Sequence, residues 1–198
     1  MEELFVKLDE IQSRCVEDWH TEEQTDFSDD LFGLVKEQHL QNFRLWHKED
    51  LARIPDADDS IIAGVKRDID TLNQKRNDQI EKIDEYILSW LSSNKIPMKE
   101  SSELNSETPG SMLDRCSIMA LRIYHMREEA DRSSATEDHR NKAKAKVETL
   151  VAQRNDLFNC LFNLIRNIKE GKRQFKIYRQ FKMYNDPTMN PQLYNKNT

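Results

Sequence analysis

Two arginines stand inside apolar helical patterns, where an unpaired charge is costly. Arg76 follows "LNQK" and Arg154 follows "LVAQ", each in register with leucine and other apolar residues. Each begins an Arg-Asn-Asp triplet, at 76–78 and 154–156. A guanidinium keeps its proton, so a buried arginine needs a carboxylate opposite it. Its planar fork also suits phosphate and carboxylate ligands. Both arginines are therefore candidate site residues.

Histidine and carboxylate side chains pair at matching positions in the two halves of the chain. His47 lies three residues before Asp50, and His125 lies three residues before Glu128. Each pair shares one helical face. The pattern predicts that Asp50 and Glu128 are the carboxylates nearest to the two arginines. The two candidate sets are His47, Asp50, Arg76 and Asp78, and His125, Glu128, Arg154 and Asp156.

Three interpretations of this polar layer stay open. It is a structural salt-bridge layer that fixes helix register, a pocket for an anionic or nucleotide-like ligand, or a metal centre. Helical-bundle metal sites place the carboxylate before the histidine, and here the order is reversed. The two arginines would also repel a cation. We therefore predict no metal ion and no cofactor.

An aromatic residue precedes each of His20, His47 and His125. A histidine beside an aromatic core residue is more often packed than functional, so the recurrence at His20 predicts packing and no site. No glycine-rich phosphate loop and no recognisable nucleophile motif occurs in the sequence.

Apolar residues recur at steps of three and four over most of the chain, which predicts an all-α protein. Glycine (4) and proline (5) are scarce, as expected where few turns are needed. The predicted helices span about 3–22, 29–54, 59–94, 109–132 and 136–170. We predict one domain, 1–198, in which helical hairpins at about 29–94 and 109–170 form a bundle. Helices at the N and C termini would lie outside this bundle, as flanking elements or dimer contacts.

The segments outside the hairpins are polar or basic. Residues 95–107 lack periodicity and predict a mobile linker. The basic aromatic segment 172–198 places aromatics at helical spacing as far as residue 184, followed by an irregular tail. We expect its aromatics to pack on the bundle and its bases to meet acidic side chains. Binding of an anionic ligand or an RNA strand is the alternative.

The two hairpins resemble each other when the sequence is shifted by 78 positions, so that 36–90 falls on 114–168. Identical pairs include Arg44/Arg122, His47/His125 and the two Arg-Asn-Asp triplets. One hairpin cannot cover its own apolar face, but two can cover each other. The pattern therefore predicts a four-helix bundle made from an internal repeat.

Charge and hydropathy limit the partners. The net charge of −6 gives no general attraction to nucleic acid or anionic membranes. No apolar run is long enough to insert into a membrane, and the acidic start "MEELFVKLDE" does not resemble a secretion signal. Three cysteines without C-x-x-C spacing predict reduced, buried thiols. We expect a cytoplasmic protein.

Four stretches carry a family resemblance: "NFRLWHKEDLAR", "KRDIDTLNQKRNDQIEKID", "TPGSMLDRCSIMALRIYHM" and "YRQFKMYNDPTMNPQLY". Together they resemble the bacterial family called domain of unknown function 4254, over about residues 5–195. The resemblance implies no activity. Family genes often lie near glycosyltransferases of cell-surface polysaccharide synthesis, which implies a sugar pathway. The family motif falls on His47, Asp50, Arg53, Arg76, Asn77, Asp78, Asp114, Arg115 and His125, and on Asn42, Trp46, Glu49, Arg67, Asp70, Asn73 and Pro109.

Two classes of function stay open on these residues. The favoured one is an accessory protein that binds an anionic metabolite or a protein partner, in surface-polysaccharide synthesis. The alternative is a hydrolase or transferase acting on a phosphorylated sugar or nucleotide, with His47 as acid/base and Arg76 or Arg154 holding the anion. A homodimer is compatible with the long helices and aromatic flanks.

Overall fold

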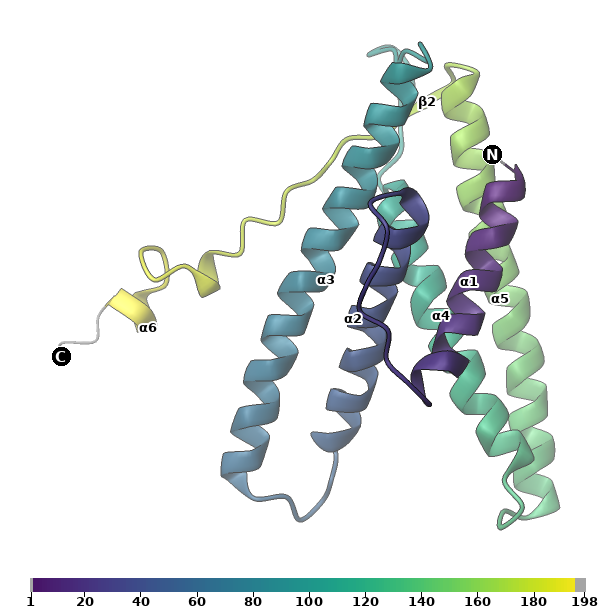
Figure 1. The fold of residues 1–198 in the computed structure, drawn as a ribbon, viewed down its shortest axis with the longest axis vertical. Coiled ribbons are helices and arrows are strands. Elements are labelled where there is room, and N and C mark those ends of the chain that lie inside the picture. Colours follow the sequence, from purple (N-terminus) through teal and green to yellow (C-terminus); the bar gives the residue numbers. More distant parts are fainter. Residues whose placement is uncertain (1, 195–198) are drawn as a thin grey trace.

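The computed structural model describes residues 2–194 and is a bundle of long helices, as predicted (Figure 1). Two hairpins, α2–α3 and α4–α5, stand side by side, and α1 packs against both. The helices are α1 (Glu2–Trp19), α2 (Leu31–Leu51), α3 (Asp59–Ser93), α4 (Pro109–Asp131), α5 (Glu137–Lys169) and α6 (Pro191–Tyr194). The remaining elements are β1 (Glu103–Leu104), β2 (Arg173–Gln174) and a 3-10 turn, Met183–Asn185.

Side-chain caps set the starts of the long helices. The carboxylates of Asp30 and Asp58 accept from backbone N–H groups at the starts of α2 and α3. At α4, Thr108 and Ser111 form a reciprocal capping box, with Pro109 as the first helical residue. These pairings satisfy N–H groups that have no partner inside the helix. They explain why the predicted starts lie within two residues of the observed ones.

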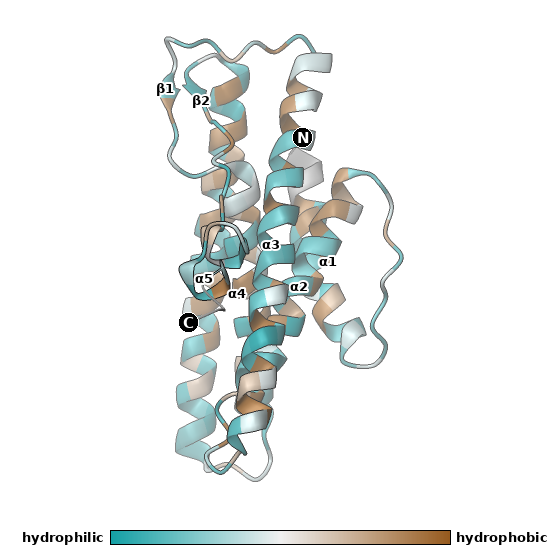
Figure 2. Ribbon diagram, turned by 90° about the vertical axis from the view of Figure 1, so that its left-hand side faces the viewer, coloured by the Kyte–Doolittle hydropathy of each residue, from teal (hydrophilic) through white to brown (hydrophobic). Residues whose placement is uncertain are grey.

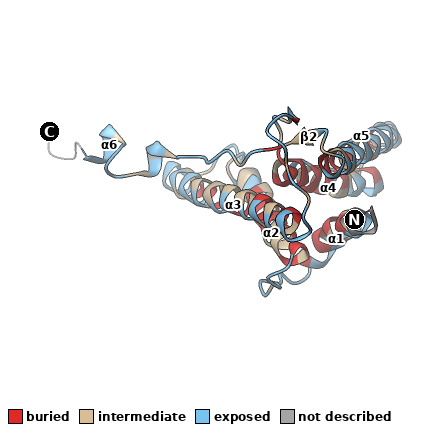
Figure 3. Ribbon diagram, turned by 90° about the horizontal axis from the view of Figure 1, so that it is seen from above, coloured by how far each residue is buried: buried red, intermediate tan, exposed pale blue. Residues whose placement is uncertain are grey.

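Helix α4 is the centre of the bundle. It contacts α1, α2, α3 and α5, and most of its length is buried (Figure 3). The largest apolar cluster draws on all five long helices and includes Leu8, Val35, Ile83, Leu113, Leu161 and Ile168. Each such side chain stabilises the fold by about 1.5–3 kcal/mol when fully buried. The hairpins are therefore joined mainly through one shared helix.

The N-terminal helix flanks the two hairpins, and its apolar face forms part of the core. Leu8, Val16 and Trp19 of α1 are buried core residues, and α1 contacts α2, α4 and α5. Two hairpins that meet through α4 leave an apolar flank, and α1 covers it. The two hairpins themselves are observed, whereas the internal repeat stays a prediction.

The chain after α5 is extended, so the predicted C-terminal helix is wrong there. β2 pairs in parallel with β1, in the predicted linker 95–107, with Glu103 opposite Arg173. This pairing satisfies backbone groups that a helix would otherwise bond. Phe175 is buried as expected, but Phe181 is 85% exposed. Residues 195–198 of the predicted tail lie outside the described part of the chain.

The arm that follows β2 runs away from the bundle in Figure 1 and is tied to it by charge. Arg179 donates to Glu81 at 2.7 Å and to Glu85, both on α3. This agrees with the expectation that the basic segment meets acidic side chains. The predicted packing of its aromatic residues holds for Phe175 and fails for Phe181.

The hydropathy of the helices is that of a bundle with mixed polar and apolar faces (Figure 2). Figure 2 shows polar and apolar residues mixed along the helices, and none of the helices between residues 2 and 194 combines the length and apolarity of a membrane span.

Cys15 and Cys116 are buried free thiols, but Cys160 is exposed. The prediction of three buried thiols is therefore wrong at Cys160, which lines an open depression between α4 and α5.

The start of α4 approaches α3 closely enough to require glycine. A Cβ on Gly110 would lie 2.5 Å from the carbonyl oxygen of Ile80 and 2.9 Å from Oδ1 of Asp84. The Gly110 N–H donates to Asp84 Oδ1 at 2.6 Å. Burial raises the pKa of Asp84 to about 6, against the opposing effect of hydrogen bonds from Thr108 and Gly110.

We predict that Gly110→Ala lowers the free energy of unfolding by about 1–3 kcal/mol, because α4 must move away from α3. Gly64→Ala is the matched control, since nothing lies within 4 Å of a Cβ there and Gly64 is inside α3. The control should be neutral or stabilising by up to about 1 kcal/mol. Urea unfolding measures both. Equal effects of the two substitutions would contradict the close approach.

Asp84 should give stability a defined pH dependence. Its folded-state pKa lies above the ordinary value of 3.8, so its contribution is full below about pH 4 and is lost as pH rises through about 6. Relative to Asp84→Asn, the wild-type protein should lose up to about 3 kcal/mol of unfolding free energy across that range. Urea unfolding of both proteins from pH 3.5 to 7.5 measures the difference, and a difference that does not change with pH would refute it.

Candidate functional site

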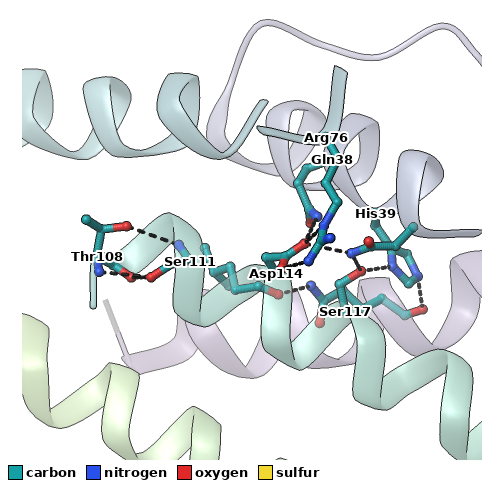
Figure 4. A network of polar contacts seen from close by, with 10 residues as sticks. Gln38, His39, Arg76, Thr108, Ser111, Asp114 and Ser117 are labelled. Carbon is teal, nitrogen blue, oxygen red and sulfur yellow. Dashed lines mark hydrogen bonds and ion pairs between the residues drawn. The ribbon is translucent and has the colours of Figure 1, made fainter. Parts of the chain in front are cut away.

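A buried carboxylate on α4 joins the two hairpins. Asp114, 5% exposed, accepts hydrogen bonds from Gln38 at 2.6 Å and Asn42 at 2.9 Å, both on α2 (Figure 4). Arg76 on α3 donates to it through Nε at 2.7 Å and through Nη2, forming a bidentate ion pair. We call these four side chains the Asp114 network. Four donors from one hairpin thus converge on a single carboxylate of the other.

The hydrogen bonds continue from this network to α1. Asn42 donates to Ser117 Oγ at 2.8 Å, and Ser117 contacts Nδ1 of His39 at 2.6 Å. Nε2 of His39 lies 2.9 Å from the carbonyl oxygen of Gln12, which can only accept, so Nε2 carries the hydrogen. Burial lowers the pKa of His39 to about 3. His39 is therefore a neutral structural link, and Ser117 donates to its Nδ1.

Arg154, the second predicted arginine, is buried among α1 and α4. It forms an ion pair with Asp9 at 2.5 Å and donates to Ser13 Oγ at 2.8 Å. Further bonds reach Gln12 Oε1 and the carbonyl oxygen of Cys116. Burial lowers the pKa of this guanidinium, against the opposing effect of Asp9. Every one of these partners is on α1 or α4.

The predicted carboxylate partners of the arginines are therefore wrong. Arg76 pairs with Asp114 and Arg154 with Asp9. Asp50 lies near the exposed end of α2, where the weak ion pair with Arg53 is 3.8 Å long. Helical spacing identified residues that share a face, but it contained no information about which helix lies opposite. The sequence did not predict that α1 packs against α4 and α5 and thereby brings Asp9 to Arg154.

The predicted histidines meet each other instead of the arginines. His47 and His125 lie with His20, just after α1, so that one ring nitrogen of each is within 4.8 Å of those of the other two. We call these three side chains the histidine cluster. His125 Nδ1 is 2.7 Å from Glu128 Oε2, and His20 Nδ1 is 2.6 Å from the carbonyl oxygen of Val16.

Desolvation lowers the pKa of His47, and the neighbouring His20 and His125 lower it further. A lower pKa favours the neutral form of the His47 imidazole, against the opposing effect of Asp50 and Glu128. Of the side chains that the structure describes, those of the histidine cluster are the ones whose candidate ligand atoms lie close enough together to hold a metal ion.

A separate cleft of about 360 Å³ lies between α2, α3 and α4. Apolar side chains including Trp46 form part of its lining. Its charged and amide residues are Asn42, Glu49, Asp50, Arg53, Asn73, Arg76 and Arg122. We call it the arginine cleft. It contains three of the predicted site residues, Asp50, Arg53 and Arg76, and one that the sequence analysis did not select, Arg122.

The remaining predicted residues lie elsewhere. Asp78 is exposed and accepts from Gln74 at 2.6 Å, while Asn77 is half-buried. Asp156 is exposed and lines a different depression, between α4 and α5, together with Cys160. The other members of the candidate set divide among the Asp114 network, the Arg154 site, the arginine cleft and the histidine cluster with its neighbour Glu128.

The fold and these polar groups define a class: an all-α bundle of two hairpins locked on a central helix by a buried guanidinium–carboxylate pair. The chain belongs to the family described as "Protein of unknown function (DUF4254)", whose model matches residues 33–177. This match is narrower than the expected 5–195 and excludes α1, with Asp9 and His20. Searches of curated proteins and of solved structures returned no match.

We predict that Asp114→Ala lowers the free energy of unfolding by about 3–5 kcal/mol, because Arg76 loses its carboxylate partner. Asp156→Ala is the control, since this aspartate is exposed, and it should change stability by no more than about 0.5 kcal/mol. Thermal and urea unfolding provide the measurement. A small effect at Asp114 would show that the hairpins do not depend on it.

Proposed function

We propose that this protein binds an anionic, hydroxyl-rich small molecule of the sugar phosphate class in the arginine cleft. The observation that carries the proposal is the meeting of three guanidinium side chains, Arg53, Arg76 and Arg122, with two carboxylates in one concave site. Arginine suits phosphate because its donors form a planar fork.

Two of the arginines that line the cleft, Arg76 and Arg122, have guanidinium N–H groups without an acceptor in the described part of the chain. Asp114 accepts hydrogen bonds from Nε and Nη2 of Arg76. The third nitrogen of that guanidinium, Nη1 of Arg76, makes no hydrogen bond to the part of the chain that the structure describes. Arg122 is exposed and has no hydrogen bond or ion pair with the side chains and backbone that the structure describes. A rigid guanidinium and an unengaged one thus line the same cleft, and an anion would supply the acceptors that they lack.

The other lining groups favour hydroxyl groups on the ligand. Glu49 and Asp50 offer carboxylate oxygens that accept from hydroxyls, and Asn73 offers both a donor and an acceptor. Trp46 adds an apolar ring of the kind that packs against carbon-rich faces. This mixture matches a phosphorylated sugar better than a bare inorganic anion, and it agrees with the sugar pathway that the family resemblance implies.

The geometry favours binding over the alternative of a hydrolase or transferase with His47 as acid/base. His47 belongs to the histidine cluster, and Arg154 is engaged by α1. Neither side chain lines the arginine cleft. An accessory, ligand-binding role therefore has the better support. A protein partner and a homodimer stay predictions from the sequence.

We predict that glucose 1-phosphate binds more tightly than glucose or inorganic phosphate, as measured by isothermal titration calorimetry. Arg122→Ala should weaken binding about tenfold or more, because a hydrogen bond to a charged group is lost. Arg122 is preferred over Arg76, whose removal would leave Asp114 buried without its cation.

Arg166→Ala is the matched control, since it removes the same charge from an exposed position in the last turn of α5. It should leave the affinity unchanged. Equal affinities of the wild type and Arg122→Ala, or the absence of binding by any of a panel of sugar phosphates, would refute the proposal.

A further inference from the structure

We propose that His20, His47 and His125 bind a divalent transition-metal ion, with Zn²⁺ as the best fit. Three imidazoles from separate parts of the chain, the end of α1, α2 and α4, meet with one ring nitrogen of each within 4.8 Å of the others. Neutral imidazole is the commonest metal ligand in proteins. Three protein ligands with an open fourth position are typical of reactive zinc sites.

The hydrogen bonds around the cluster orient two of the rings for metal binding. His125 is bonded through Nδ1 to Glu128 at 2.7 Å, and His20 through Nδ1 to the carbonyl oxygen of Val16 at 2.6 Å. Both acceptors hold the hydrogen on Nδ1, which leaves the lone pair on Nε2. Metal-bound histidines are oriented in this way by carboxylates and backbone carbonyls.

Two of the ring nitrogens are buried without a partner. Nε2 of His47 and Nε2 of His125 make no hydrogen bond within the described chain. Buried polar atoms in proteins almost always have a hydrogen-bond partner or another ligand. Metal coordination at Nε2 would satisfy both atoms at once. Aromatic packing, which the rings also make through Trp46 stacked on His125 at 4.7 Å, does not satisfy them.

The electrostatic argument against a metal does not apply at this position. The sequence predicted that two arginines would repel a cation, but Arg76 is paired with Asp114 and Arg154 with Asp9. The acids that act on His47 are Asp50 and Glu128, which favour a positive charge. Imidazole ligands select zinc and similar transition metals over Mg²⁺ and Ca²⁺, which prefer oxygen.

The open side of the cluster is at His20, which is exposed, whereas His47 and His125 are half-buried. Bonds of about 2.0–2.1 Å to one ion require the three nitrogens to move closer together. His20 follows the last residue of α1 and begins the loop to α2, so it is the ligand best placed to close on the ion. Solvent then has access to the fourth coordination position.

The test uses untagged, chelator-treated protein, to which Zn²⁺ is added and from which excess is removed. Elemental analysis should find one Zn²⁺ per chain, and Co²⁺ in its place should give the visible absorption bands of a tetrahedral or five-coordinate site. His47→Phe and His125→Phe, which keep a packed ring but remove the ligand atom, should each lose the bound ion.

Glu128→Gln tests the positioning of His125 and should weaken Zn²⁺ binding by about 10–100-fold, as is typical when a carboxylate behind a metal-bound histidine is changed. His139→Ala is the control, because His139 lies outside the histidine cluster and contacts Glu129. Circular dichroism confirms that each variant is folded. Failure of the wild type to retain Zn²⁺, or retention by His47→Phe and His125→Phe equal to that of His139→Ala, would overturn the proposal.

Discussion

The structure depends on one constraint: the carboxylate of Asp114 is buried where the two hairpins meet. A buried charge is tolerated only with a counter-charge and several hydrogen bonds. Arg76 supplies the charge, and Gln38 and Asn42 supply further donors. All of these come from the opposite hairpin, so a change in the relative position of the hairpins breaks several bonds together. Hydrophobic packing holds the helices together, and Asp114 specifies how they are aligned.

The helices were largely predictable from the sequence because a helix is determined mainly by residues that are close together in the sequence. Apolar spacing located the five long helices, and in the structure the side chains of Asp58 and Thr108 cap two of their starts. The burial of Arg154 was predictable in the same way. Helical content beyond residue 172 was not, because spacing alone does not exclude a strand pairing with a distant segment. Phe175 and Phe181 fit a helical stripe, yet the chain there is extended.

The candidate site was predictable as a set of residues but not as an arrangement. Spacing selected His47, His125 and both arginines, yet they belong to different sites. Partners such as Asp9 and Asp114 come from helices whose positions depend on the whole fold. Arg122 carried a visible signal, since it corresponds to Arg44 in the proposed repeat. The sequence predicted that His20 is packed because an aromatic residue precedes it, and it contained no sign that His47 and His125 lie beside it.

The short ladder between β1 and β2 bears on how this chain assembles. Glu103 pairs with Arg173, so the connection between the hairpins is secured by residues beyond α5. Asp114, by contrast, follows that connection by a few residues. A ribosome releases the N-terminal elements first, so the first hairpin and Asp114 are available well before β2 exists. Closure of the ladder is thus a late contact of biosynthesis, followed by the ion pairs of Arg179 with α3. A nascent protein lacking its final segment already contains the polar junction of its hairpins.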